Sequence, residues 1–349
     1  AFGRAAPAAE AAAQRLLFVG NSYTFVNDLP GTYKSLAESR LPGLSVTVDS
    51  DVKGSRTLGE AAHAASCKEK VSAGNYDFLV LQDQSCLGGM PDDFFPQKRA
   101  SEVALETFFG PQAAKAGATV VLFETWGRRD GAPTNCGSEI FDTIYPTFGA
   151  MQSKLTAGYT AYQAKLKKAG ARAIVARVGE AHASVRLRRE GLFRSLYASD
   201  GSHPTPLGQY LAGSVLFAAI NGGQASRWRP PSASWRAGGV SAHEAEALAA
   251  FAAPRRSRAT PEAMQGEWAA MYELKAPTVW RVRGGAVSGL MHGQYRLQGY
   301  VSKSGRWLDP RSRKPTGTRV KRLQGDTAWW SDGDVWTRVA NVSEPLLRI

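Results

Sequence analysis

Two short segments, far apart in the sequence, carry the residue types that acyl-transfer chemistry needs. Asp200 and His203 lie three residues apart in a loop-like stretch rich in Gly and Pro. One loop of this kind can supply both a general base and the carboxylate that orients it. Ser22 comes just after an apolar run that ends at Gly20. Alone it would be a helix cap, but with Asp200 and His203 it predicts a Ser-His-Asp triad.

The elements that would position this triad follow a strand–helix alternation. The sequence contains five short, near-continuous apolar runs, which are typical of strands buried on both faces of a parallel sheet. Ser22 would lie at the carboxyl edge of that sheet. Between the last two runs, apolar residues from Phe148 to Leu166 recur at helical spacing, and Gly170 is expected to end that helix. The pattern predicts an α/β fold with a doubly wound parallel sheet. The runs span residues 16–20, 44–48, 77–81, 118–123 and 173–176.

A second pattern begins near residue 254. Ser241 and Glu244 form a capping box that opens a short helix, and this helix is expected to close the first domain. Short runs rich in Val, Tyr, Trp and Thr follow, separated by hairpin-turn pairs such as Gly284-Gly285. We expect a small antiparallel β module whose tryptophans supply its core, with a sugar- or polymer-binding face of tryptophans as the alternative. The predicted parts are an Ala-rich tail (1–15), a hydrolase domain (16–253), a basic linker (254–265) and the Trp-rich module (266–349).

Six blocks in the first domain resemble the SGNH hydrolase (GDSL-like esterase) family. The resemblance is to a branch whose nucleophile block has Gly-Asn-Ser in place of Gly-Asp-Ser, and the blocks occur in order over residues 16–253. They are Gly20-Asn-Ser-Tyr-Thr24, Val52-Lys-Gly-Ser-Arg-Thr-Leu58, Leu79-Val-Leu-Gln-Asp-Gln-Ser85, Glu124-Thr-Trp126, Val178-Gly-Glu-Ala181 and Asp200-Gly-Ser-His203.

The resemblance implies a flavodoxin-like three-layer sandwich and an oxyanion hole. In that family the hole comprises the backbone N–H groups of the nucleophile and of a Gly, here Ser22 and Gly54, with one amide side chain. Most members have an Asn that this chain lacks. We expect Gln82 in its place, with Gln84 as the competitor, whereas a Gln82 that only bonds backbone is the structural alternative. The expected substrate rim is Asn21, Gln84, Glu124 and Trp126, with Glu180 in a similar position.

The cysteines and the remaining histidines indicate no further catalytic site. Cys86 and Cys136 follow strands that end at the same sheet edge, so either a disulfide or free thiols fit. The sequence has no Gly-x-Ser-x-Gly elbow, Gly-x-Gly-x-x-Gly motif or Walker loop, which argues against an α/β-hydrolase, a nicotinamide enzyme and a nucleotidase. We expect neither metal nor cofactor. The remaining histidines lack a partner at catalytic spacing and are expected at the surface or in the core: His63, His182, His243 and His292.

Composition and net charge limit the class of protein and the binding partners that it can have. The 349 residues are 43% hydrophobic and 21% charged, as in a folded globular protein, and no apolar stretch is long enough to cross a membrane. The Ala-rich start resembles a processed or truncated end, and an extracytoplasmic location is favoured without being fixed. The net charge is +13, and residues 254–349 contribute +9 of it. The module is therefore expected to suit an anionic surface, whereas nucleic acid is not an expected partner.

The leading hypothesis is a serine esterase. It would remove a small acyl group, with acetyl expected from family tendency, from a hydroxylated substrate such as a carbohydrate, through an acyl-enzyme on Ser22. The alternative is a degenerate hydrolase that binds an anionic polymer or membrane through its basic β module.

Overall fold

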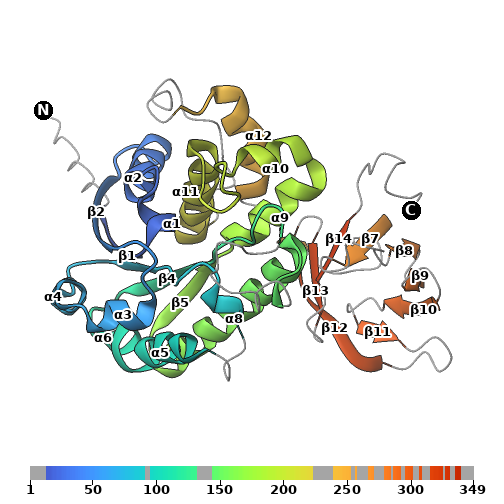
Figure 1. The fold of residues 1–349 in the computed structure, drawn as a ribbon, viewed down its shortest axis with the longest axis horizontal. Helices are drawn as coiled ribbons and strands as arrows, with labels where there is room; N and C mark the ends of the chain where they lie inside the picture. The colour runs from blue at the N-terminus through green and yellow to red at the C-terminus, as the bar shows by residue number, and fades with distance from the viewer. Residues whose placement is uncertain are drawn as a thin grey trace, which may run out of the picture.

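The protein has a parallel α/β domain followed by an antiparallel β module (Figure 1). The computed structural model describes residues 13–90, 95–131, 144–222 and 239–252. For the C-terminal part it describes only the backbone of nine strands between residues 256 and 338.

The first domain is built on five parallel strands in the order β2-β1-β3-β4-β5. This is the flavodoxin-like order, in which ligands bind at the carboxyl edge beside the switch point between β1 and β3. The strands are β1 (Ala13–Gly20), β2 (Ser45–Val52), β3 (Phe78–Leu81), β4 (Thr119–Phe123) and β5 (Arg172–Ala176).

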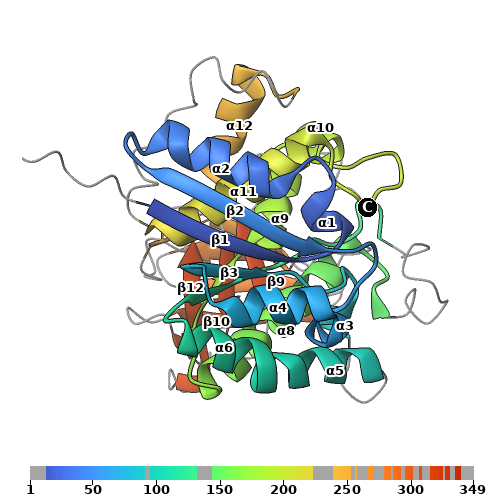
Figure 2. The ribbon, with the colours of Figure 1, turned by 90° about the vertical axis from the view of Figure 1, so that its left-hand side faces the viewer.

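Helices cover both faces of this sheet, which gives the expected three layers (Figure 2). On one face lie α2 (Leu29–Arg40), α9 (Val178–Arg188), α10 (Glu190–Ser195), α11 (Pro206–Asn221) and α12 (Ala242–Ala252). On the other lie α3 (Leu58–His63), α4 (Ala65–Ala73), α5 (Pro96–Ala104), α6 (Gly110–Lys115) and α8 (Phe148–Lys168), with a π-helical turn, Leu105–Phe109, between α5 and α6.

Side-chain alternation along β1 explains why the sheet needs both layers. Leu16 and Phe18 pack into the core under α2 and α11, whereas Leu17 and Val19 pack into the core under α4 and α8. All four are at most 3% exposed. Because successive side chains of a strand point to opposite faces, an apolar run of this kind is stable only between two helical layers.

The C-terminal strands form a closed antiparallel ring. From β7 to β14 each strand pairs with the next, and β14 pairs back with β7, while β6 adds to the edge of β12. The strands are β6 (Arg256–Ser257), β7 (Gly266–Ala270), β8 (Val279–Arg283), β9 (Ala286–Met291), β10 (Tyr295–Val301), β11 (Arg306–Leu308), β12 (Pro315–Gln324), β13 (Thr327–Trp330) and β14 (Val335–Arg338).

The expected fold class is confirmed, and two expected boundaries shift. β1 begins at Ala13 rather than at residue 16, because it pairs with β2 from its first residue and because Asp77 accepts a hydrogen bond from the backbone N–H of Arg15. Within the expected linker 254–265, Arg256 and Ser257 form β6. The capping box of Ser241 opens α12 as expected.

Candidate active site

The nucleophile candidate lies on a tight turn at the end of β1. Asn21 caps the one-turn helix α1 (Ser22–Phe25), and its Oδ1 accepts a hydrogen bond from the Tyr23 N–H at 3.2 Å. Gly20 is required here, because a Cβ at this position would lie 2.4 Å from Thr24 Oγ1 and 2.7 Å from Gln82 Oε1. The turn therefore presents Ser22 at the carboxyl edge of the sheet, with its N–H among the first-turn donors that have no helical partner.

Ser22, His203 and Asp200 meet in a hydrogen-bonded row. The Ser22 Oγ lies 2.9 Å from His203 Nε2, and His203 Nδ1 lies 2.6 Å from Asp200 Oδ2. Because an ionised carboxylate only accepts, Nδ1 carries the proton, and the Nε2 lone pair is directed at the Ser22 hydroxyl. This is the arrangement in which a Ser is activated by a general base.

The loop that carries Asp200 and His203 is held in a closed shape by backbone hydrogen bonds. Ala198 donates to the His203 carbonyl at 2.8 Å, and Arg129 donates to the Gly201 carbonyl at 2.9 Å. Gly201 has a φ of +66°, a conformation that favours glycine. The loop thereby returns on itself and brings the acid and the base together.

Asp200 is held in its charged form. Partial burial alone would raise its pKa, but hydrogen bonds from the His203 side chain and from the backbone N–H groups of Ser202 and His203 outweigh that effect. The pKa of Asp200 therefore lies below its usual value. The carboxylate stays ionised in the mildly acid range, where it can stabilise an imidazolium on His203.

The loop after β2 brings Gly54 next to the nucleophile turn. Lys53 donates its backbone N–H to the Gly20 carbonyl at 3.2 Å, and Asn21 Nδ2 donates to the Arg56 carbonyl at 3.0 Å. A buried ion pair with Asp51 fixes the Arg56 side chain. Gly54 itself is exposed, and a Cβ there would meet no atom within 4 Å. Its N–H donates to no acceptor among the described residues, as an oxyanion donor requires.

Gln82 lies beneath the nucleophile turn, which corrects its expected role. The side chain is fully buried, and its Oε1 accepts hydrogen bonds from the Asn21 N–H and the Thr24 hydroxyl, both at 2.9 Å. Its Nε2 donates to the Asp83 carbonyl. Gln82 thus positions the turn, as its structural alternative foresaw, because a fully enclosed amide does not face the space where an ester would bind.

Of the two glutamines, Gln84 is the better placed to donate an amide N–H to a bound ester. It is partly exposed, and its Oε1 accepts a hydrogen bond from the Cys86 N–H at 2.7 Å. The Gln84 amide oxygen is thereby occupied by a backbone N–H, and the amide nitrogen remains available as a donor. In the sequence Gln82 and Gln84 look equivalent, and only their burial separates them.

Asp83, between the two glutamines, is a site residue that sequence reasoning missed. Its carboxyl is fully buried and accepts hydrogen bonds from the N–H groups of Leu58 and Gln84 and from the hydroxyls of Ser101 and Tyr162, at 2.8–3.1 Å. Burial raises the pKa of Asp83 despite these donors. An acidic residue inside an apolar strand end was the available signal. Its effect is to fix the loop that carries Gln84.

Three of the expected rim residues are buried, and so is Glu180 at 8% exposure, which corrects their placement. Asn21 is 2% exposed and caps α1. Glu124 is fully buried between Arg177, Gln152 and Thr156. Trp126 is fully buried and donates its indole N–H to the Ser202 carbonyl at 3.0 Å. These polar groups face inward because each satisfies a buried partner, so they support the loops of the site rather than contact solvent.

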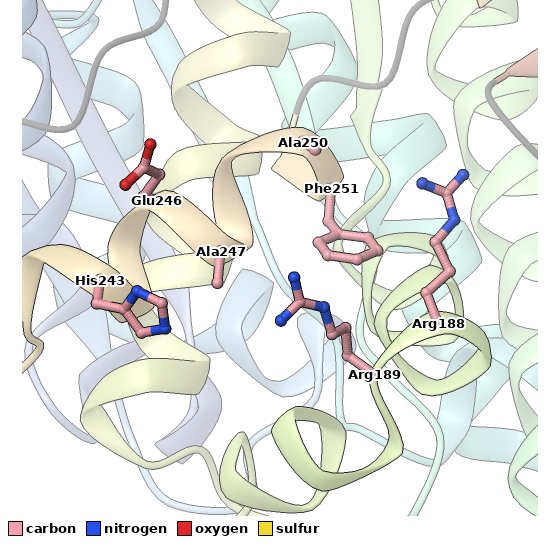
Figure 3. A pocket seen from close by; sticks show the side chains of 7 residues that line it. All are labelled: Arg188, Arg189, His243, Glu246, Ala247, Ala250 and Phe251. Carbon is pink, nitrogen blue, oxygen red and sulfur yellow. The ribbon is translucent and has the colours of Figure 1, made fainter.

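Other candidate residues lie apart from the triad. Cys67 is a free buried thiol, Cys86 is disulfide-bonded, and Cys136 lies outside the described residues. His243 lines a groove of about 450 Å³ between the end of α9 and α12, with Arg188, Arg189 and Phe251 among its neighbours (Figure 3).

Two further features are absent from the described part of the chain. No group of three or more His, Cys, Asp or Glu residues is arranged to hold a metal ion there. No described helix is both long enough and apolar enough to cross a bilayer.

Comparisons with known proteins return structural likeness only. No family model and no curated protein matches the chain. An α/β hydrolase enzyme, LAE5, from the Lake Arreo metagenome is 14% identical, with a TM-score of 0.45 over 60% of this chain and 96% of that one. The acetylxylan esterase Axe2 of Geobacillus stearothermophilus is 14% identical (TM-score 0.41; 61% and 94%). A putative GDSL-like lipase of Parabacteroides merdae is 15% identical (0.42; 60% and 95%).

Proposed function

We propose that the protein is a serine ester hydrolase. The observation that carries the proposal is the row Ser22 Oγ···His203 Nε2 and His203 Nδ1···Asp200 Oδ2, at 2.9 and 2.6 Å. This row lies at the carboxyl edge of the sheet, where open α/β folds bind ligands. It supports acyl transfer because it provides a nucleophile, a base and a carboxylate that orients the base.

In the proposed reaction, Ser22 Oγ attacks the ester carbonyl carbon while His203 Nε2 takes the hydroxyl proton. The tetrahedral intermediate then collapses, the bond to the alcohol oxygen breaks, and His203 returns its proton to that oxygen. Water attacks the resulting acyl-Ser22 ester with His203 again as base, which releases the carboxylic acid and restores the Ser22 hydroxyl. Asp200 holds the imidazole in the required tautomer and stabilises its protonated form.

We propose Ser22 N–H, Gly54 N–H and the Gln84 side-chain amide as the oxyanion donors. Gly54 and Gln84 lie on the loops that follow β2 and β3, the two neighbours of β1 in the sheet. Asn21 ties the first loop to the nucleophile turn, and Asp83 fixes the second. Donors held in this way do not reorganise when charge develops on the carbonyl oxygen, which is the condition for strong stabilisation.

For the substrate, we propose a short acyl ester, acetyl in the first instance, on a carbohydrate. Acyl length and alcohol rest on the family resemblance. One local observation favours a sugar: Phe25 is 43% exposed and lies three residues after Ser22 on the same helical turn. Residues with this spacing share a helix face. The exposed ring therefore offers an apolar surface beside the nucleophile for one face of a pyranose.

For the C-terminal module, we propose docking on a polyanion. Residues 254–349 carry a net charge of +9, most of the +13 of the whole chain, so this is the part that an anionic polymer would attract. Its described backbone is a closed antiparallel ring with β6 added at one edge.

Of the 17 basic residues in 254–349, 13 are arginine. Arginine forks match carboxylate and sulfate groups, so an acidic polysaccharide is the proposed partner.

Replacing Ser22 by Ala is expected to lower kcat/KM for p-nitrophenyl acetate at least a thousandfold, because only binding and oxyanion stabilisation remain. The melting temperature should stay within about 2 °C of the wild type. Ser72→Ala, an exposed serine on α4, is the matched control and should keep full activity. Substantial ester turnover by Ser22→Ala would remove Ser22 as the nucleophile.

The two glutamines are expected to fail in different ways. Gln82→Ala leaves two buried donors without an acceptor and should lower the free energy of unfolding by about 1–3 kcal/mol for each orphaned group. Gln84→Ala should instead lower kcat about a hundredfold with KM nearly unchanged. Chemical denaturation and ester kinetics on both variants measure the contrast. A normal kcat in Gln84→Ala would exclude it as an oxyanion donor.

Binding to pectate is expected to depend on the arginines of the C-terminal module. The wild type should bind more weakly as NaCl is raised, and a triple variant with Arg281, Arg296 and Arg319 changed to Gln should lose at least tenfold in affinity. The charge-matched control changes Lys115, Lys167 and Lys168, exposed on the first domain, and should lose less than twofold. Equal losses in both variants, or binding to phosphatidylserine vesicles without binding to pectate, would contradict the proposal.

A further inference from the structure

Ser202, between the proposed acid and base, is tied to three different groups. It is 2% exposed, and its N–H donates to Asp200 Oδ1 at 2.9 Å. Its carbonyl accepts from the Trp126 indole at 3.0 Å, and its Oγ lies 2.9 Å from the Tyr23 hydroxyl. Because Tyr23 directly follows Ser22 in the chain, Ser202 links the loop of the base to the turn of the nucleophile.

The residues that hold Ser202 belong to a column of stacked rings. Tyr23 stacks on Trp126 with centroids 4.5 Å apart and an interplanar angle of 12°, and Trp126 stacks on His182 at 4.6 Å and 11°. At the other end, the Tyr23 ring meets His203 edge-on at 5.6 Å. Tyr23, Trp126 and His182 are at most 2% exposed. The column therefore provides a rigid, enclosed wall behind the imidazole.

The direction of the hydrogen bond between Tyr23 and Ser202 follows from Arg128. A guanidinium only donates, and Arg128 donates to the Tyr23 hydroxyl oxygen. The phenol hydrogen is then available for Ser202 Oγ, and the adjacent positive charge makes it a stronger donor. At the far end of the column, burial lowers the pKa of His182 to about 4, so that ring remains neutral at neutral pH.

The imidazole needs such support because its own loop is open to solvent. The side chains of His203 and Asp200 are 37% and 39% exposed, so little packing restrains them. In the proposed reaction the imidazole becomes charged and neutral again twice in each turnover. A displacement of about 1 Å from the attacking oxygen is enough to cost on the order of a hundredfold in rate.

We propose that Tyr23, Trp126 and Ser202 form a brace that holds His203 at a fixed position relative to Ser22. They are positioning residues, since they act on the base through the loop and the ring column and do not touch the reacting atoms. The assignment rests on the proposed esterase activity for its kinetic consequences, whereas its effect on the loop is independent of that activity.

The kinetic test uses Tyr23→Phe and Ser202→Ala, which remove the same hydrogen bond from its two sides. Each should lower kcat for p-nitrophenyl acetate ten- to a hundredfold with KM within twofold. The double variant should be no worse than Tyr23→Phe, which already removes this hydrogen bond together with the one from Arg128. Ser202→Thr, which keeps the hydroxyl, should recover most of the lost kcat.

Matched controls separate positioning from a loss of stability. Tyr33→Phe removes another buried phenol, bonded to Gln14 Oε1 at 3.0 Å, and Ser214→Ala removes another buried hydroxyl. Both should change the melting temperature without changing kcat. Additive losses in the double variant, a rise in KM without a fall in kcat, or a similar fall in kcat in the controls would overturn the brace.

Amide hydrogen exchange is a second test of the brace, and it does not depend on catalysis. The Ala198 N–H is bonded to the His203 carbonyl and reports on closure of the loop. It should exchange faster in Tyr23→Phe and Ser202→Ala than in the wild type, and at the wild-type rate in Tyr33→Phe. If the wild type hydrolyses no ester, the proposed function fails, and the exchange rate of Ala198 alone decides for or against the brace.

Discussion

The 2.9 Å hydrogen bond between Ser22 Oγ and His203 Nε2 joins two loops that are 181 residues apart in the chain. Several neighbouring groups keep these two atoms at that distance. The parallel sheet brings both loops to one edge, Gly20 allows the nucleophile turn to pack closely, and Asp200 fixes the imidazole from the other side. Acyl transfer depends on this distance more than on any single donor.

Buried polar groups, rather than apolar packing alone, hold the loops of the site. Gln82 fixes the nucleophile turn, Asp83 fixes the loop of Gln84, and Glu124 joins the segments after β4 and β5 through Gln152 and Arg177. Each group is fully enclosed and fully engaged, so removing one would leave its partners unsatisfied. The geometry of the reactive side chains is thus set by the buried polar side chains beneath them.

How far the sequence predicts this arrangement depends on the range of the interactions involved. The strands, the helix that ends before Gly170 and the pairing of Asp200 with His203 follow from local patterns, and the structure agrees with them. The roles of Gln82 and Glu124 did not follow, because burial is decided by neighbours distant in sequence. The same holds for the column of Tyr23, Trp126 and His182, whose members come from three separate segments. The closure of the C-terminal strands into a ring required the strand pairing.

The central claim is that Ser22 is a nucleophile activated by His203. The most direct measurement is the rate at which a fluorophosphonate modifies the protein as a function of pH, with the adduct located by peptide mass spectrometry. A single adduct on Ser22 is expected, at a rate that falls on acidification, because a protonated imidazole cannot accept the Ser22 proton. The lowered pKa of Asp200 keeps that carboxylate ionised in the mildly acid range, so its own protonation does not cause the fall there. No adduct, an adduct on another residue, or a rate independent of pH would contradict the account.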